Sequence, residues 1–211
     1  TGANLANREL IYLGVSGDGD SASIGLGQFC HAMRRRVNMV YIVENNGTYG
    51  LTKGQFSATN DKASKSKKGE ANLFDAIDLC TLGIQLGAGF VARGFSGDNL
   101  HLAQLMKGAI AHKGFALVDV FSPCVTYNKH NTYPWFRERV YKLEDERHDP
   151  ADFRLAIEKA FEWGARIPLG LFYRVERPTY EDEEPALRSG RALAKRPLER
   201  TDLAAIMEDF I

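Results

Sequence analysis

The sequence lacks several features that would restrict it to particular protein classes. Lys and Arg total 27, and so do Asp and Glu, so the formal charge is zero and the basic excess of a nucleic-acid-binding domain is missing. No apolar run approaches the roughly 18 residues that a membrane-spanning helix needs, and we expect no secretory leader. We therefore predict neither a nucleic-acid partner nor a membrane protein.

Cysteine is also scarce. Cys30, Cys80 and Cys124 are an odd number of widely spaced residues, which excludes a disulfide framework or a local cysteine metal motif. Cys30 and Cys80 fall within helical core patterns and are interpreted as structural. We expect a reducing compartment, the cytoplasm.

What is present is the pattern of an α/β fold. Apolar residues make up 44% and charged residues 26% of the 211, which is typical of a globular chain and argues against disorder. Apolar strands alternate with amphipathic helices, which predicts a parallel sheet flanked by helices. The predicted strands span residues 10–16, 39–43, 89–93 and 115–121, and the predicted helices span residues 22–37, 74–87 and 98–113.

A glycine-rich turn follows the first predicted strand. It reads Gly17-Asp18-Gly19-Asp20 and leads into a helix, an arrangement that leaves backbone N–H groups free to bind an anion. Asp18 would repel a bare diphosphate, but a divalent cation between the two removes this conflict. Mg²⁺ suits such a place, because it is held by few protein oxygens together with phosphate oxygens.

The second predicted strand ends in Asn45-Asn46-Gly47-Thr48. Neighbouring parallel strands bring their carboxyl ends together, so the Asn46 side chain and the Thr48 main-chain carbonyl are candidate ligands of the same cation as Asp18. Asp-Gly and Asn-Gly are also common hairpin turns, and either pair alone could be only that.

The two turns together resemble the signature of thiamine-diphosphate enzymes. The words SGDGDSASIG, NNGTYGLTKGQFSAT, FVARGF, SPCVTYN and RIPLGLFYRVERPTYE resemble the β subunits of 2-oxoacid:ferredoxin oxidoreductases, over nearly the whole chain. The resemblance implies the thiamine-diphosphate-binding fold for residues 1–175. It also implies that an N-terminal segment of the family is missing before Thr1.

The resemblance assigns roles to individual residues. Asp18, Asn46 and Thr48 would hold Mg²⁺, and Gly17, Gly19 and Asp20 would line the diphosphate of the cofactor. Lys53 would pair with the distal carboxylate of a dicarboxylic 2-oxoacid. Cys124 would be the last of four ligands to a 4Fe–4S cluster, whose other three lie outside this chain.

The activity implied is oxidative decarboxylation of a 2-oxoacid, with 2-oxoglutarate favoured by Lys53 and the word NTYPWF at residues 131–136. Coenzyme A would accept the acyl group, and ferredoxin would accept electrons through the cluster. An α subunit would be required, in a dimer of αβ pairs. Two alternatives stay open: a non-oxidative thiamine-diphosphate decarboxylase or synthase, and a non-catalytic scaffold.

Residues 176–211 form the second predicted unit. They are charged, contain Glu181-Asp182-Glu183-Glu184, and read as an extended tail that contacts another subunit or is simply solvated. Phe172, Tyr173 and Tyr180 are candidate aromatic anchors for a partner, although packing within the chain explains them equally well.

Overall fold

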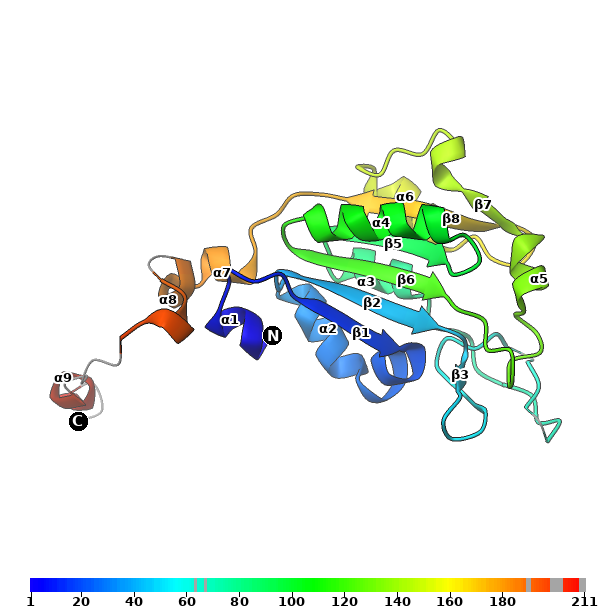
Figure 1. Cartoon of the computed structure of the whole chain (residues 1–211), viewed down its shortest axis with the longest axis horizontal. Helices are drawn as coiled ribbons and strands as arrows, with labels where there is room; N and C mark the ends of the chain where they lie inside the picture. Colours follow the sequence, from blue (N-terminus) through cyan, green and yellow to red (C-terminus); the bar gives the residue numbers. More distant parts are fainter. Residues whose placement is uncertain (63, 67, 189–190, 198–202, 209–211) are drawn as a thin grey trace.

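A six-stranded sheet with helices on both faces forms the centre of the computed structural model, which describes residues 1–62, 64–66, 68–188, 191–197 and 203–208 (Figure 1). The strands, in their order across the sheet, are β1 (Leu13–Gly17), β2 (Met39–Asn45), β6 (Phe115–Phe121), β5 (Phe90–Phe95), β8 (Ile167–Arg174) and β7 (Val140–Lys142). A separate hairpin pairs β3 (Thr48–Tyr49) with β4 (Gln55–Phe56).

Helices connect most of the strands, precede the first one and follow the last one. They are α1 (Gly2–Ala6), α2 (Leu26–Arg34), α3 (Leu79–Gln85), α4 (Asn99–Ala111), α5 (Tyr133–Arg137), α6 (Phe153–Ala160), α7 (Tyr180–Glu183), α8 (Pro185–Arg188) and α9 (Leu203–Glu208). Shorter helical turns are η1 (Asp20–Ile24), η2 (Leu143–Asp145) and η3 (Leu193–Lys195). Within the described ranges, no helix is both long and apolar enough to cross a membrane.

Strand direction divides the sheet into two parts. β1, β2, β6 and β5 run parallel to one another, so the predicted parallel sheet is confirmed for the part that carries the glycine-rich turn. β8 runs antiparallel to β5, and β7 runs parallel to β8, so the far edge reverses direction. Mixed sheets of this kind are common, and no local pattern in the β8 sequence indicates the reversal.

The two faces of the parallel part are buried by different helices. Helices α2, α3 and α6 cover one face, where Phe29, Met33 and Ile84 pack on Leu117 and neighbouring strand residues. Helix α4 covers the other face. Because both faces are buried, β5 and β6 are apolar almost throughout, as the sequence indicated.

The predicted helix over residues 22–37 is interrupted. A wide turn, η1, is closed by a bond from the Gly25 N–H to the Asp20 carbonyl (2.6 Å), and the α-helix begins only at Leu26. A Cβ at Gly25 would lie 2.5 Å from the same carbonyl, so only glycine fits there. The predicted helix over 74–87 also starts later, at Leu79, where the Asp78 side chain accepts a bond from the Thr81 N–H.

The beginning of the tail packs against the chain itself. Thr179 and Glu181 are buried, and the Asn38 side chain donates to Glu181 (3.2 Å). The Arg36 side chain donates to the Pro178 carbonyl (2.7 Å), which ties α7 to the start of β2 (Figure 1). The reading of residues 181–184 as a fully solvated run is therefore wrong. Contact of residues 176–211 with another subunit stays a prediction, part of which lies outside the described residues.

Phe172 and Tyr173 are core residues rather than partner anchors. Both lie in β8 and are at most 4% exposed. The charged residues that follow them in the sequence suggested a surface segment, but both faces of β8 are covered by other parts of the chain. Of the two interpretations left open for Phe172 and Tyr173, packing within the chain is the one that the structure shows, and a role as partner anchors is excluded for both.

Candidate functional site

The predicted metal-binding residues meet at the carboxyl ends of β1 and β2. Gly17 and Glu44 lie side by side in the parallel register, so the chain leaves both strands at the same edge. The Asn46 N–H donates to Asp18 Oδ1 (3.3 Å) and the Gly47 N–H donates to Asp18 Oδ2 (3.1 Å). The structure thus brings Asp18 and Asn46 together, as the strand pattern predicted.

Two hydroxyl groups complete the surroundings of the Asp18 carboxylate. Ser57 donates a hydrogen bond to Oδ2, and the Thr59 hydroxyl lies 2.6 Å from the same oxygen. Asp18 is only 1% exposed. These two N–H groups and two hydroxyls are all neutral, and a buried carboxylate held by neutral donors alone is costly. Within the described residues Oδ1 accepts one long bond, so it is the oxygen better placed to accept a cation, which fits Mg²⁺ chemistry.

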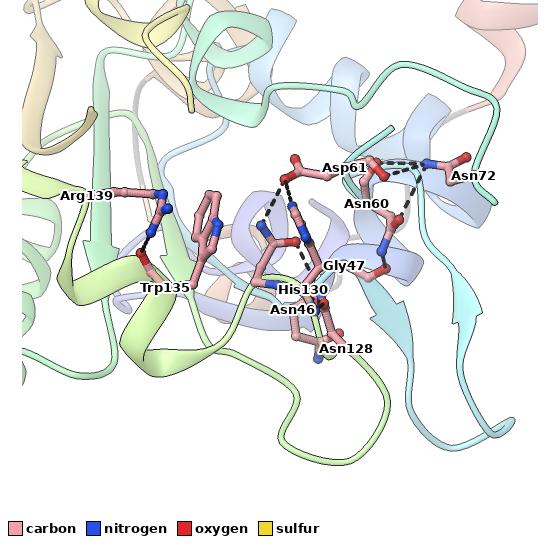
Figure 2. Close-up of polar contacts among 10 residues, drawn as sticks. Asn46, Gly47, Asn60, Asp61, Asn72, Asn128, His130, Trp135 and Arg139 are labelled. Carbon is pink, nitrogen blue, oxygen red and sulfur yellow. Dashed lines mark hydrogen bonds and ion pairs between the residues drawn. The ribbon is translucent and has the colours of Figure 1, made fainter. Parts of the chain in front are cut away.

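Asparagine side chains hold the Asn46–Gly47 turn, as Figure 2 shows. Asn128, from the loop after β6, donates to the Asn46 carbonyl (3.1 Å). Asn60, from the loop after β4, donates to the Gly47 carbonyl (2.9 Å). Neither asparagine was singled out from the sequence, although both lie within or beside the words QFSAT and SPCVTYN. Polar loop residues carry no periodic signal that would mark them.

Thr48 links this turn to Cys124. Its N–H (2.9 Å) and its hydroxyl (3.1 Å) both contact Asn46 Oδ1. Partial burial raises the pKa of the Cys124 thiol, but hydrogen bonds from the Tyr127 and Thr126 N–H groups and from the Thr48 hydroxyl outweigh it and hold the pKa below its ordinary value. The Tyr127 nitrogen lies 3.4 Å from the sulfur. Cys124 therefore lies directly beside the predicted metal site, in a thiolate-favouring environment.

A four-thiolate cluster does not fit the described residues by themselves. Cys80 is fully buried under the sheet, where its thiol approaches the Ala92 carbonyl (3.9 Å), and Cys30 lies on α2. The described part of the chain holds no group of three or more His, Cys, Asp or Glu side chains placed for a metal ion. Any cluster at Cys124 needs its other ligands from elsewhere.

The remaining predicted residues are arranged as follows. Gly19 packs under the Tyr49 ring, where a Cβ would lie 2.5 Å from a ring carbon, and the Tyr49 hydroxyl donates to the Gly19 carbonyl (2.9 Å). Gly17 faces open space, and Asp20 is exposed at the start of η1. Lys53 is exposed at the tip of the β3–β4 hairpin, with φ of 80°, and is not gathered with Asp18 and Asn46.

A cavity of about 530 Å³ adjoins the turn. Its wall includes the polar residues Asn46, Gly47 and Asn128 and the aromatic residues Phe121 and Trp163. Such a volume at the carboxyl edge of a mainly parallel sheet is where this class of fold binds small molecules.

A buried ion pair supports the cavity wall. The Arg93 guanidinium bonds Asp119 (3.1 Å) and Asp78, and both Arg93 and Asp119 are 1% exposed. Burial raises the pKa of Asp119, and Arg93 opposes this only in part. The Asn45 side chain donates to Asp119 (2.9 Å), and the Thr59 hydroxyl lies 2.9 Å from Asn45 Oδ1. The pair is thereby joined to Asp18 through two neutral side chains.

Two protein-family models match this chain. Residues 1–120 match the family model of the C-terminal TPP-binding domain of thiamine pyrophosphate enzymes, and residues 124–189 match that of the C-terminal part of the pyruvate ferredoxin oxidoreductase beta subunit. The site and fold thus define a thiamine-pyrophosphate-binding α/β domain.

Individual relatives narrow the class. The 2-oxoacid:ferredoxin oxidoreductase subunit beta of Saccharolobus solfataricus is 42% identical over 93% of this chain and 68% of its own length. The corresponding subunit beta from a Sulfolobus species is 45% identical over 86% of this chain. The chain belongs to the family of 2-oxoacid:ferredoxin oxidoreductase β subunits, which confirms the resemblance.

A solved structure agrees with this assignment. The 2-oxoglutarate:ferredoxin oxidoreductase from Magnetococcus marinus, with 2-oxoglutarate, coenzyme A and succinyl-CoA bound, has a TM-score of 0.80 and 37% identity over 85% of this chain. The chain spans 62% of that protein's chain and 64% of the Sulfolobus relative.

Proposed function

We propose that this chain is the thiamine-diphosphate-binding part of an enzyme that oxidatively decarboxylates 2-oxoglutarate and transfers the acyl group to coenzyme A, with ferredoxin as electron acceptor. The observation that carries the proposal is the buried Asp18 carboxylate, held by neutral donors against the Asn46–Gly47 turn. Family membership supports the choice of reaction, as do the 2-oxoglutarate and coenzyme A bound in the Magnetococcus structure.

Each predicted residue has a role in this proposal. Asp18, Asn46 and the Thr48 carbonyl would hold Mg²⁺, while Gly17, Gly19 and Asp20 would face the diphosphate. Thiamine diphosphate, when bound, would supply the carbanion that attacks the 2-oxo carbon. The chain's own contribution is to fix the diphosphate end through the cation and the free N–H groups at the start of η1.

Lys53 is proposed to bind the distal carboxylate of the substrate. An exposed lysine at the tip of a short hairpin is free to meet an anion that enters from outside. Cys124 is proposed as one ligand of a 4Fe–4S cluster whose other ligands lie beyond these residues. The Thr48 and backbone hydrogen bonds to its sulfur suit a ligated thiolate.

A partner α subunit is proposed to complete the active site, in a dimer of αβ pairs in the cytoplasm. Large apolar side chains are exposed on the loops around the site: Leu51 (99%), Phe74 (78%) and Val125 (73%). Exposed apolar groups gathered near a polar site are typical of a surface that another protein covers. The chain alone is therefore expected to be inactive.

Isothermal titration of the assembled enzyme with thiamine diphosphate tests the proposal. Binding should require Mg²⁺ and should be lost in the Asp18→Ala variant. Asn4→Ala, a buried residue at the opposite end of the domain, is the matched control and should bind normally. Absence of binding by the wild type, or unchanged binding by Asp18→Ala, would contradict the proposal.

A further inference from the structure

The Asn46–Gly47 turn receives one side-chain amide on each of its two carbonyl groups. Asn128 donates to the Asn46 carbonyl and Asn60 donates to the Gly47 carbonyl, at 3.1 and 2.9 Å. The two asparagines are 5% and 2% exposed, and they come from different loops (Figure 2). The turn is thus held from two sides by groups that are themselves buried.

The space around Gly47 shows how closely these amides approach. Gly47 has a φ of +73°, and a Cβ there would lie 3.1 Å from Asn128 Nδ2 and 3.2 Å from Asn60 Nδ2. Glycine permits both the dihedral and the approach. The amide nitrogens therefore close on the residue that follows the proposed metal ligand Asn46.

Each asparagine is in turn held by further hydrogen bonds. Asn128 Oδ1 accepts from the N–H groups of His130 and Asn131, both at 3.0 Å. The Asn60 carbonyl accepts from the Asn72 side chain (3.0 Å). The Asn128 side chain is therefore bonded at both its nitrogen and its oxygen, and Asn60 is held through its main chain.

We propose that Asn60 and Asn128 are positioning residues that hold the Asn46–Gly47 turn in its cation-binding geometry before the cofactor arrives. This inference rests on the proposed function. The two amides contact the turn's carbonyls and so hold the backbone whose N–H groups reach Asp18, while Thr48 holds the Asn46 side chain. Groups that orient a metal ligand in this way commonly set metal affinity, because an unrestrained ligand must be ordered when the metal binds.

Binding of Mn²⁺ in place of Mg²⁺ tests this inference. Mn²⁺ is titrated into the assembled enzyme at saturating thiamine diphosphate, and the free ion is followed by its electron paramagnetic resonance signal. Asn60→Ala and Asn128→Ala should each weaken Mn²⁺ binding by about 10- to 100-fold, the usual range for residues that orient a metal ligand. Asn60→Leu and Asn128→Leu keep a branched side chain of similar shape but lose the N–H donor, and they add no charge near the cation. They should also weaken Mn²⁺ binding, and they serve if an alanine variant does not fold.

Two controls separate the possible failures. Asn4→Ala removes an equally buried asparagine that bonds the Asn38 carbonyl far from the site, so it should leave Mn²⁺ binding unchanged. Retained Mn²⁺ binding in Asp18→Ala would overturn the proposed function itself. Two results would overturn the positioning role alone, provided that Asp18→Ala loses Mn²⁺ binding. One is wild-type Mn²⁺ binding in all four variants of Asn60 and Asn128, and the other is an equal weakening in Asn4→Ala.

Discussion

Replacement of Arg93 by methionine should destabilise the domain strongly. Arg93 is 1% exposed, pairs with the equally buried Asp119, and lies between the Phe121 and Phe172 rings at 5.2 and 5.1 Å. Arg93→Met removes the cation and leaves the Asp119 carboxylate buried with the Asn45 amide. Breaking a buried pair in this way costs about 3–5 kcal/mol. For a chain of this length that corresponds to a fall in Tm of roughly 6–20 °C.

Thermal and urea unfolding of three proteins would measure the effect: the wild type, Arg93→Met, and the double variant Arg93→Met with Asp119→Asn. The double variant removes the buried unpaired charge at position 119 and retains a side chain that bonds Asn45. Asp78 also loses its pairing with Arg93, but it is partly exposed to water, so the double variant should recover most of the loss. A single variant within about 0.5 kcal/mol of the wild type, the size of an ordinary surface change, would refute the reasoning. So would a double variant no more stable than the single one.

The same variant should show a characteristic pH dependence. Burial already raises the pKa of Asp119 in the native protein despite Arg93. A raised carboxyl pKa means that the folded state binds the proton more tightly than the unfolded state. Its contribution to stability is therefore fully present below the unfolded pKa and is lost as pH rises through the folded value. The loss of unfolding free energy in Arg93→Met, relative to the wild type, should shrink as pH falls from neutral towards the folded-state pKa of Asp119. A loss that does not change with pH would contradict this account.

Three further predictions concern the site. Gly47→Ala should cost about 1–2 kcal/mol, since an L-residue is strained at a φ of +73°, and should weaken thiamine-diphosphate binding; urea unfolding and calorimetry measure the two effects. Lys53→Ala should raise KM for 2-oxoglutarate about ten- to hundred-fold by removing a charge-assisted bond but leave KM for pyruvate unchanged, and equal effects on both substrates in steady-state assays would exclude the proposed carboxylate contact. Cys124→Ser should reduce the iron content of the full-length enzyme, and undiminished iron would remove Cys124 from the cluster ligands.

The sequence predicted the part of the fold that local patterns determine. Continuous apolar strands, each followed by a polar turn, located the edge where Asp18 and Asn46 meet, because the carboxyl ends of parallel strands must lie together. The reversed strand β8 was not foreseen. Its direction depends on pairing with β5, a contact between distant segments that leaves no periodic trace. The sequence left Phe172 and Tyr173 undecided between a partner contact and the core for the same reason, since the residues that cover β8 come from elsewhere in the chain.

The sequence indicated where the candidate ligands lie, but not which residues hold them in place. Asp18, Asn46 and Thr48 belong to turns that follow strands, and the strands indicate where such turns lie. Ser57 and Asn60 come from a long loop whose course no pattern specifies, yet both bond the Asp18 carboxylate or the neighbouring turn. Long-range side-chain contacts from loops are set by the folded chain as a whole, so a single sequence does not show them.

A chain of hydrogen bonds runs from Asp18 through Thr59 and Asn45 to Asp119, and it shows how a cation at Asp18 would affect the buried ion pair. The Asn45 side-chain nitrogen donates to Asp119, so the Asn45 Oδ1 atom must point towards Thr59. The Thr59 hydroxyl then lies 2.6 Å from Asp18 Oδ2 and 2.9 Å from Asn45 Oδ1, but it has one proton for two acceptors. Without a cation, that proton serves either the buried carboxylate or the amide. A divalent ion at Asp18 Oδ1 would offset the carboxylate charge and leave the Thr59 proton for Asn45, while the Gly47 N–H and the Ser57 hydroxyl still donate to Oδ2.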